Sequence, residues 1–195
     1  MSILSASLLL FFVIDPIGNV PLFIGALKSV ERQRHKRIII RELSIGFIIL
    51  LIFLLFGRYI LVLLQISENA LSVAGGIVLF MISIKMVFSG SEKIFEGNLE
   101  SEPFIVPLAV PLIAGPSAMA MVMLLVAREP TRILEWVLAL LFAWIISGLI
   151  LFFSDYLSKL LGKRALTAME RLMGMVLTTV AVQMLITGIR ESLYH

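Results

Sequence analysis

Six apolar runs, each roughly 20 residues or longer, account for most of this sequence. A helix needs about 20 apolar residues to cross the roughly 30 Å hydrocarbon core of a bilayer, so each run is long enough to span a membrane. The runs do not alternate between apolar and polar residues, and lipid cannot satisfy free backbone groups, so helices are favoured over a β-barrel. The predicted spans are Leu4–Leu27, Ile38–Leu64, Ala70–Phe88, Phe104–Ala127, Ile133–Phe153 and Ala165–Ile189.

The composition excludes an ordinary soluble domain. Hydrophobic residues make up 60% of the chain and charged residues 15%, whereas soluble domains are about half apolar and about a quarter charged. The absence of cysteine excludes disulfides and thiolate metal sites. The pI of about 9.4 does not indicate a nucleic-acid partner, because the basic residues flank apolar runs, where they set topology. No metal or cofactor is expected.

The lysine and arginine residues lie mostly on one side of the predicted spans. Twelve of the 16 follow the first, third and fifth spans or lie near their ends, namely Lys28, Arg32, Arg34, Lys36, Arg37, Arg41, Lys85, Lys93, Lys159, Lys163, Arg164 and Arg171. The other side carries Arg58, Arg128, Arg132 and Arg190. By the positive-inside rule the richer side is cytoplasmic, so both termini are predicted to be non-cytoplasmic.

Two proline-containing motifs interrupt the first and fourth spans. The first, DPIGNVPLF, carries Asp15, Pro16 and Pro21. The second, VPLIAGPSAM, carries Pro111 and Pro116, 95 residues after the first pair. A proline removes a helical hydrogen bond, and backbone groups freed inside a membrane must line a cavity or bind a ligand. We therefore expect both proline-to-proline stretches to be non-helical at mid-membrane and to face each other.

These motifs also indicate an internal repeat. A second similarity, at an offset of 98 residues, aligns GGIVLFMISIKMVFSG with LMGMVLTTVAVQMLITG and places Leu79 on Leu177. Two halves of three spans each must enter the membrane in opposite orientations, which is the inverted repeat of many secondary transporters. The predicted fold is all-α and polytopic, with six transmembrane helices of which helices 1 and 4 are broken. Its boundaries are 1–195 for a single membrane domain, 1–90 for the first repeat, 91–103 for a linker and 104–195 for the second repeat.

The breaks predict a binding site for a small anionic group. Asp15–Pro16 and Gly115–Pro116 are each suited to start a half-helix. The N-terminus of a half-helix offers free N–H groups and partial positive charge to a carboxylate or phosphate. Small side chains there let a ligand approach the backbone. The predicted substrate-binding residues are Asp15, Pro16, Gly18, Asn19, Pro21, Pro111, Ala114, Gly115, Pro116 and Ser117.

Asp15 is the ionisable residue that we place near mid-depth. A carboxylate there costs about 3 kcal/mol on insertion scales, which favours a function for it. The alternative is that Asp15 only caps the second half of its helix. We predict that Asp15 carries a coupling proton, with Glu42 and Glu170 as the next candidates.

The motifs DPIGNVPLF, GGIVLFMISIKM and VPLIAGPSAM resemble the MarC family of six-span inner-membrane proteins of bacteria and archaea, and most closely its YhgN-like members. The resemblance covers essentially the whole chain. It implies kinship with the LysE-type exporter superfamily and, for some members, proton-driven transport of small neutral amino acids such as glycine and alanine. The residues that match the first motif of the family are Asp15, Pro16, Gly18, Asn19 and Pro21. Those that match the second motif are Pro111, Ala114, Gly115 and Pro116. Ser117 stands where many members have glycine.

Two classes of function remain open. A secondary transporter would move a small zwitterion, or export a small solute or drug, whereas a flippase would use the same site for the phosphate of an anionic lipid carrier. A small, closed, polar pocket favours the amino acid, and a lateral opening between spans favours the lipid. HExxH and GxSxG motifs and clusters at metal-ligand spacing are absent from the sequence, so an enzyme is not expected. The expected partners are membrane lipids and a small-molecule substrate, and the pattern is compatible with a homo-oligomer.

Overall fold

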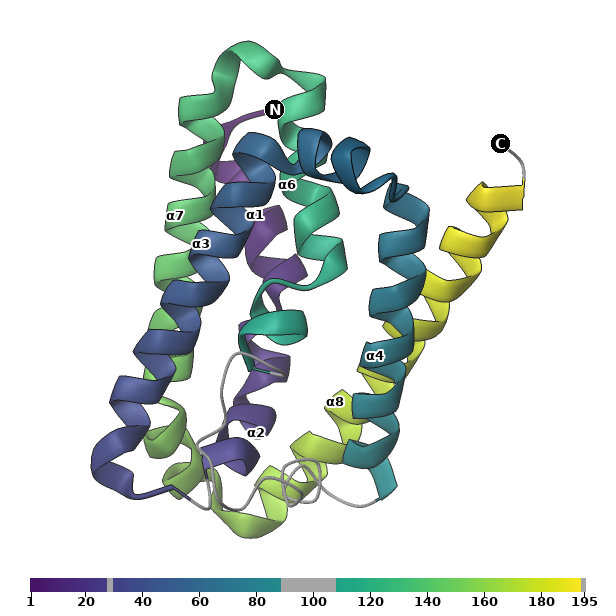
Figure 1. Ribbon diagram of the computed structural model, residues 1–195. Helices are drawn as coiled ribbons and strands as arrows, with labels where there is room; N and C mark the ends of the chain where they lie inside the picture. The colour runs from purple at the N-terminus through teal and green to yellow at the C-terminus, as the bar shows by residue number, and fades with distance from the viewer. Residues whose placement is uncertain (28–29, 89–107, 194–195) are drawn as a thin grey trace.

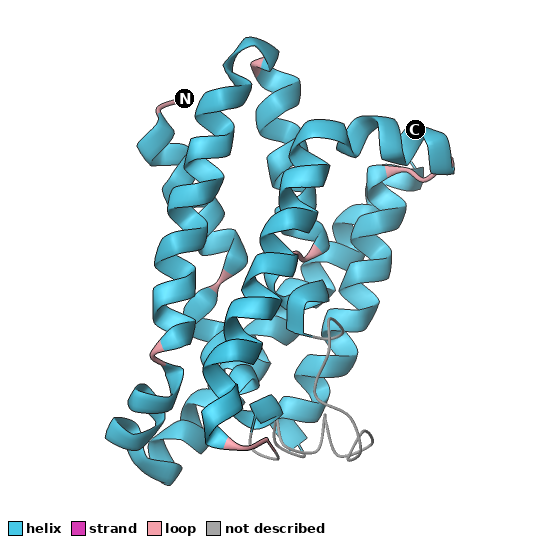
Figure 2. Cartoon of the chain, turned by 60° about the vertical axis from the view of Figure 1, so that its left-hand side comes forward, coloured by secondary structure: helices cyan, strands magenta, loops and turns pink. Residues whose placement is uncertain are grey.

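The computed structural model describes residues 1–27, 30–88 and 108–193, and all regular secondary structure in these ranges is helical. The all-α prediction is therefore confirmed for this part of the chain. In chain order (Figure 1) the elements are α1 (Ile3–Ile14), α2 (Pro16–Leu27), α3 (Arg32–Leu64), α4 (Glu68–Phe88), the π-helical turn η2 (Leu108–Ile113), α6 (Pro116–Arg128), the 3-10 turn η3 (Pro130–Arg132), α7 (Ile133–Phe152) and α8 (Ser154–Leu193). Short loop segments separate helices inside the bundle (Figure 2).

Five helical segments within the described ranges are long and apolar enough to cross a membrane. They are Ile3–Leu27, Arg32–Leu64, Asn69–Phe88, Pro130–Phe152 and Arg164–Leu193. The predicted fourth span, Phe104–Ala127, is not one of these five segments. Residues 104–107 lie outside the described ranges. In the rest of the span, η2 is a distorted turn and α6 has only 13 residues. At 1.5 Å per residue α6 covers about 20 Å, less than the roughly 30 Å of hydrocarbon. The fourth predicted span therefore contains a helix of about two thirds of the needed length.

α1 and α2 follow each other end to end through the centre of a helical bundle (Figure 1). α1 packs along α7, α6 packs along α3, and α3 also packs along α7. α4 and α8 pack on each other and form a separate pair at one flank, next to α6 and α2. The start of α1 and the end of α8 lie at the same end of the molecule.

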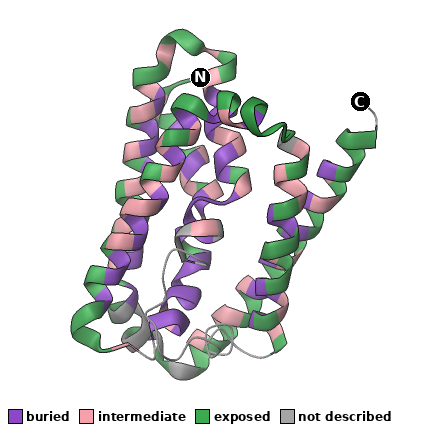
Figure 3. Ribbon diagram, viewed as in Figure 1, coloured by how far each residue is buried: buried purple, intermediate pink, exposed green. Residues whose placement is uncertain are grey.

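Burial follows this arrangement (Figure 3). α2 is buried on nearly all sides, and Val20, Leu22 and Phe23 have no exposed surface. Its sequence, apolar apart from Asn19, fits that position, because a helix surrounded by others needs no polar face. α4 and α8 instead expose large apolar side chains, such as Phe88 and Ile186. Exposed apolar surface on this scale marks contact with lipid or with another apolar partner.

α8 bends sharply at Gly162. The φ angle of 71° at this residue lies in the left-handed region, which glycine adopts without strain. The segment before the bend lies across the end of the bundle where α3 begins, and the segment from Arg164 onward is the last candidate span (Figure 1). The bend thus turns the chain from the bundle surface into the membrane.

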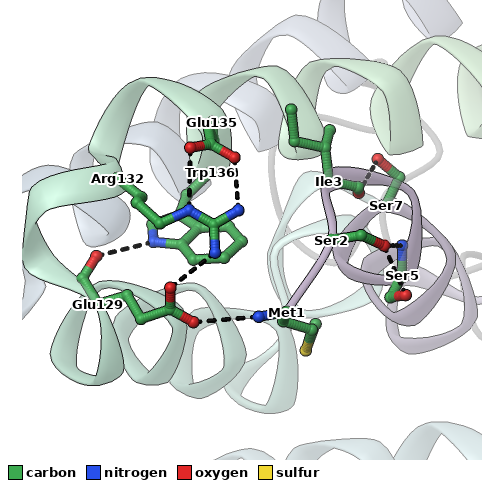
Figure 4. Close-up of polar contacts among 9 residues, drawn as sticks. All are labelled: Met1, Ser2, Ile3, Ser5, Ser7, Glu129, Arg132, Glu135 and Trp136. Carbon is green, nitrogen blue, oxygen red and sulfur yellow. Dashed lines mark hydrogen bonds and ion pairs between the residues drawn. The ribbon is translucent and has the colours of Figure 1, made fainter.

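A cluster of ion pairs holds the α6–α7 connection against the start of α1 (Figure 4). Arg132 donates to Glu129 at 2.6 Å and to Glu135 at 2.5 Å, and its Cζ lies 4.8 Å from the ring centroid of Trp136. The Glu129 carboxylate also accepts a hydrogen bond from the amino group of Met1 at 3.1 Å, and the indole N–H of Trp136 donates to the Glu129 carbonyl. The hydrogen bond from Arg132, and then that from Met1, hold the pKa of Glu129 below its ordinary value.

Candidate functional site

The first interruption is at Asp15, between α1 and α2. Its φ of 46° and ψ of 60° lie in the left-handed region, which aspartate enters more readily than most residues. Its backbone N–H donates to the carbonyl of Phe11, and its Oδ1 accepts a hydrogen bond from the backbone N–H of Gly18 at 3.0 Å. Asp15 therefore ends α1 and caps the N-terminus of α2.

This interruption is shorter than the sequence predicted. We expected the stretch from Pro16 to Pro21 to be non-helical, and this was wrong, because α2 begins at Pro16 and continues through Pro21 to Leu27. Pro16 occupies the first helical position, where a backbone N–H has no intrahelical partner in any case. Pro21 removes one internal hydrogen bond, but the packing around the buried α2 keeps the helix continuous.

The second motif is interrupted at two places. Val110 is extended within η2, with φ −126° and ψ 127°, and Gly115 is extended immediately before α6, with φ −74° and ψ 162°. The predicted non-helical stretch Pro111–Pro116 is non-helical only at Ala114 and Gly115, because η2 continues to residue 113 and α6 begins at Pro116. Gly115 has no side chain to cap α6, so the first N–H groups of α6 lack the cap that Asp15 gives α2.

Asn19 connects the two interruptions. Its Nδ2 donates to the carbonyl oxygen of Ile14 at 2.9 Å and to that of Leu112 at 3.1 Å. The side chain is buried, and both acceptors lie near the ends of helical segments, where carbonyls lack intrahelical partners. The two interruptions therefore lie side by side in the interior of the bundle.

A cavity of about 320 Å³ lies at these interruptions. Asp15 and Asn19 of the first motif and Gly115 and Ser117 of the second line it, so it gathers four predicted substrate-binding residues. The remaining lining is apolar and consists of Phe12, Val13, Ile14, Leu79, Leu112, Val176, Leu177 and Val180. These residues come from α1, α4, η2 and α8.

The other predicted substrate-binding residues do not line this cavity. Those buried outside its lining are Pro16, Gly18, Pro21 and Ala114. Gly18 lies against the Asp15 carboxylate, and an added Cβ would overlap with it. Pro116 packs against Gly75 of α4 so closely that a Cβ on Gly75 would overlap the proline ring. The side chain of Pro111 lies outside the part that the structure describes.

The sequence analysis did not predict that α4 and α8 form part of the cavity lining. Leu79 of α4 and Leu177 of α8 both line the cavity. They are the pair that the 98-residue offset aligns. That similarity was the one signal for them, since a leucine in an apolar span is otherwise indistinguishable from a lipid-facing residue.

The cavity opens on the flank of the bundle. Phe12, Val176 and Val180 in its lining are 73%, 44% and 41% exposed. They lie near the middle of the candidate spans Ile3–Leu27 and Arg164–Leu193. The cavity therefore has a lateral opening toward the membrane.

The other two candidate coupling residues lie away from the cavity. Glu42 of α3 has no exposed surface, and its Oε1 accepts a hydrogen bond from Arg41 Nε at 2.8 Å. Glu170 is half-buried on α8. Among the described residues, no group of three or more His, Asp or Glu side chains is placed to hold a metal ion.

Comparison with known proteins identifies relatives. The chain matches the family described as "MarC family integral membrane protein" over residues 1–193. It is 45% identical over 195 residues to a UPF0056 membrane protein of Buchnera aphidicola subsp. Baizongia pistaciae, with 98% of each chain covered. It is 43% identical over 189 residues to the UPF0056 inner membrane protein YhgN of Escherichia coli (strain K12), with 96% of each covered. A UPF0056 membrane protein of Methanocaldococcus jannaschii is 35% identical over 191 residues, with 92% of this chain and 83% of the other covered.

No solved structure matches this chain. The family match nevertheless extends over nearly the full length, and two of these relatives cover almost the whole chain. The described helices include several that are long and apolar enough to cross a bilayer. The chain is therefore an integral membrane protein that belongs to the MarC family.

Proposed function

We propose that this protein is a secondary transporter that carries a small neutral amino acid or a similar small solute across the cytoplasmic membrane. The observation that carries the proposal is the cavity between the two interruptions, which gathers Asp15, Asn19, Gly115 and Ser117. Polar groups at mid-membrane depth are costly and mark substrate or ion paths. Discontinuous helices of this kind form the substrate sites of many secondary transporters.

The cavity offers groups suited to both charges of a zwitterion. The start of α6 presents N–H groups that Gly115 leaves uncapped, with the Ser117 hydroxyl nearby, and would bind a carboxylate. The Asp15 carboxylate and the amide oxygen of Asn19 would accept hydrogen bonds from an ammonium group. A volume of about 320 Å³ is at the small end of ligand sites and suits a small solute.

Two inverted repeats, residues 1–90 and 104–195, would build this site, joined by the linker 91–103, which lies outside the described residues. Asp15 and Val110, which leave helical geometry inside the two motifs, are 95 residues apart, the same offset as the proline pairs. α1 packs on α7 and α6 packs on α3, so each interrupted helix contacts the long helix of the other half. Two halves related by a two-fold axis in the membrane plane are expected to make such reciprocal helix contacts. Rocking of the α4–α8 pair against the other helices would then expose the cavity to each side in turn.

The end of the molecule that carries the starts of α3 and α8 would face the cytoplasm. The basic N-terminal turns of α3 and the start of α8 lie at that end, together with the end of α4 (Figure 1). The positive-inside rule places such an end in the cytoplasm and both termini outside it. Reporter fusions to each terminus test this orientation. If a reporter that is active only in the cytoplasm is active at the C-terminus, the orientation is the opposite of the one proposed.

A second candidate function is a flippase for an anionic lipid-phosphate carrier. The lateral opening beside Phe12, Val176 and Val180 favours it, because a lipid could keep its chains in the bilayer while its phosphate reaches the start of α6. The small volume of the cavity favours the small solute instead. Neither function requires catalysis by the protein.

Proteoliposomes containing the purified protein test both functions. One arm measures uptake and efflux of labelled glycine, alanine and other small amino acids under an imposed pH gradient. The other arm measures transfer of a fluorescent lipid phosphate between leaflets. We expect saturable exchange of at least one amino acid, absent from empty liposomes and from a Ser117→Trp variant that fills the cavity. Transfer of the lipid without exchange of any amino acid would contradict the transporter function and support the flippase function.

A further inference from the structure

Glu42 is a buried carboxylate with one unused oxygen. Its Oε1 accepts a hydrogen bond from Arg41 Nε at 2.8 Å, whereas its Oε2 has no hydrogen-bond partner within the described ranges. The Glu42 side chain has no exposed surface, and that of Arg41 is 30% exposed. The pair therefore connects the interior to the surface, with the free oxygen on the inner side.

A buried apolar cluster begins beside Glu42 in the chain, and two buried hydroxyl groups of α7 and α8 also lack hydrogen-bond partners among the described residues. Its neighbour Leu43 belongs to a buried cluster that includes Leu177 of α8, a residue that also lines the cavity. Ser147 of α7 and Ser154 of α8 are buried, and their hydroxyl oxygens make no hydrogen bond in the part of the chain that is described. The cluster to which the neighbour of Glu42 belongs therefore extends to one wall of the cavity.

Glu42 and Ser147 belong to the same stretch of the α3–α7 contact. The residues that follow them, Leu43 and Gly148, approach each other, since a Cβ on Gly148 would lie 3.5 Å from Leu43 Cδ1. Trp144 Nε1 donates to the Leu43 carbonyl at 2.8 Å and fixes the register of the two helices. The residues that precede Leu43 and Gly148 in the chain, Glu42 and Ser147, thus each carry a buried oxygen without a hydrogen-bond partner among the described residues.

The neighbouring helices α2 and α7 carry few titratable groups. α2 contains none, and Glu135, the one charged residue of α7, lies at the opposite end of that helix. The groups at the same end of the described molecule on α3 and α8 include His35, Lys36, Arg41, Arg164, Glu170 and Arg171. Arg41 forms an ion pair with the Glu42 carboxylate at 2.8 Å.

A buried carboxylate oxygen without a donor is satisfied by a proton or by a small cation, because a buried polar atom without a hydrogen-bond partner is costly. We propose that Glu42 Oε2 is the binding site of the monovalent cation, H⁺ or Na⁺, whose gradient drives transport, with Ser147 Oγ as an additional ligand or hydrogen-bond acceptor. This inference rests on the proposed function. Cation binding would act on the substrate through the packed cluster that reaches Leu177. Asp15 is less suited to this role, because its Oδ1 already caps α2.

Infrared difference spectroscopy on the protein in liposomes tests the site without measuring transport. Spectra are recorded at neutral and acidic pH, with Na⁺ or choline as the cation, for the wild type, Glu42→Gln and the control Glu31→Gln, which changes an exposed residue before α3. We expect a protonated-carboxyl C=O band in the wild type and the control that Glu42→Gln lacks. Loss of the band on adding Na⁺ at constant pH identifies Na⁺, and indifference to Na⁺ identifies H⁺. If the Glu42→Gln variant has the same spectrum as the wild type, the proposed cation site at Glu42 is wrong.

Transport then tests the coupling. Glu42→Gln should retain substrate exchange but lose accumulation against a gradient, and full accumulation by this variant would overturn the coupling role. Failure of the proposed function is seen separately, as absence of exchange by the wild type. If Glu42→Gln does not fold, Ser147→Ala keeps the carboxyl and should shift the frequency of the band. A Ser147→Ala spectrum identical to that of the wild type contradicts the inference.

Discussion

The side-chain amide of Asn19 lies 3.1 Å from the carbonyl oxygen of Leu112, 93 residues further along the chain. The same Nδ2 donates to the carbonyl of Ile14 at 2.9 Å. One buried amide group thus satisfies a carbonyl at each of the two helix interruptions. This explains in physical terms why a span that is otherwise apolar contains an asparagine.

The first prediction concerns this link. Asn19→Leu has a similar volume but no donor, so it leaves two buried carbonyls without partners, at a cost of about 1–3 kcal/mol for each. We expect a clear fall in the melting temperature in detergent and a loss of substrate exchange. Gln183→Leu is the control, because its amide bonds only to Thr187 on an exposed face. Equal melting temperatures for the two variants would show that the link is not structural.

The second prediction concerns the contact between α4 and α6. Gly75→Ala places a methyl group into the ring of Pro116, so α4 must move away from the start of α6. Overpacking of this kind costs about 1–3 kcal/mol. We expect lower stability and impaired exchange, measured by melting and by proteoliposome assay. Gly148→Ala is the matched control, because its Cβ would meet only Leu43 Cδ1, at 3.5 Å.

The third prediction tests the cavity itself. Ser117 is exposed within the cavity lining, so Ser117→Trp fills the space without displacing core residues. We expect normal folding and loss of exchange. Leu124→Trp, on the exposed face of the same helix and outside the cavity lining, should retain exchange. Exchange that survives Ser117→Trp would place the substrate path elsewhere.

The fourth prediction concerns pH. The hydrogen bond from Arg132 lowers the pKa of Glu129 from its ordinary value of 4.5. A carboxyl group whose pKa is lower in the folded state stabilises the fold above its unfolded pKa and loses this effect as the pH falls through the folded value. The melting temperature of Glu129→Gln should therefore lie below that of the wild type at neutral pH, and the gap should close on acidification below about pH 4.5. Glu191→Gln, at an exposed position near the end of α8, serves as the control.

The sequence predicted the helical membrane fold and the family, because apolar length is a strong local signal and the motifs are specific. It overestimated the extent of the first interruption, since burial of α2 holds Pro21 inside a helix and local rules do not include burial. It also predicted a full fourth span, although hydropathy cannot distinguish one long helix from a short helix preceded by a distorted turn. The wall formed by Leu79 and Leu177 was not predicted, because its residue types are those of any apolar span.

The last prediction separates the two roles that the sequence left open for Asp15. Asparagine caps a helix about as well as aspartate and also enters the left-handed region readily, so Asp15→Asn keeps both the cap on Gly18 and the backbone geometry while removing the charge. Asp15→Ala removes the cap as well, at a cost of about 1 kcal/mol, and must place alanine at a φ of 46°. Because Oδ1 is already used as a cap, we expect Asp15→Asn to retain stability and the coupling of transport to the gradient, with weaker substrate binding because the second carboxylate oxygen is lost, and Asp15→Ala to lose stability. Proteoliposome transport and melting curves for both variants check this. If Asp15→Asn keeps substrate exchange but loses accumulation, Asp15 itself carries the coupling proton, and Glu42 does not act alone.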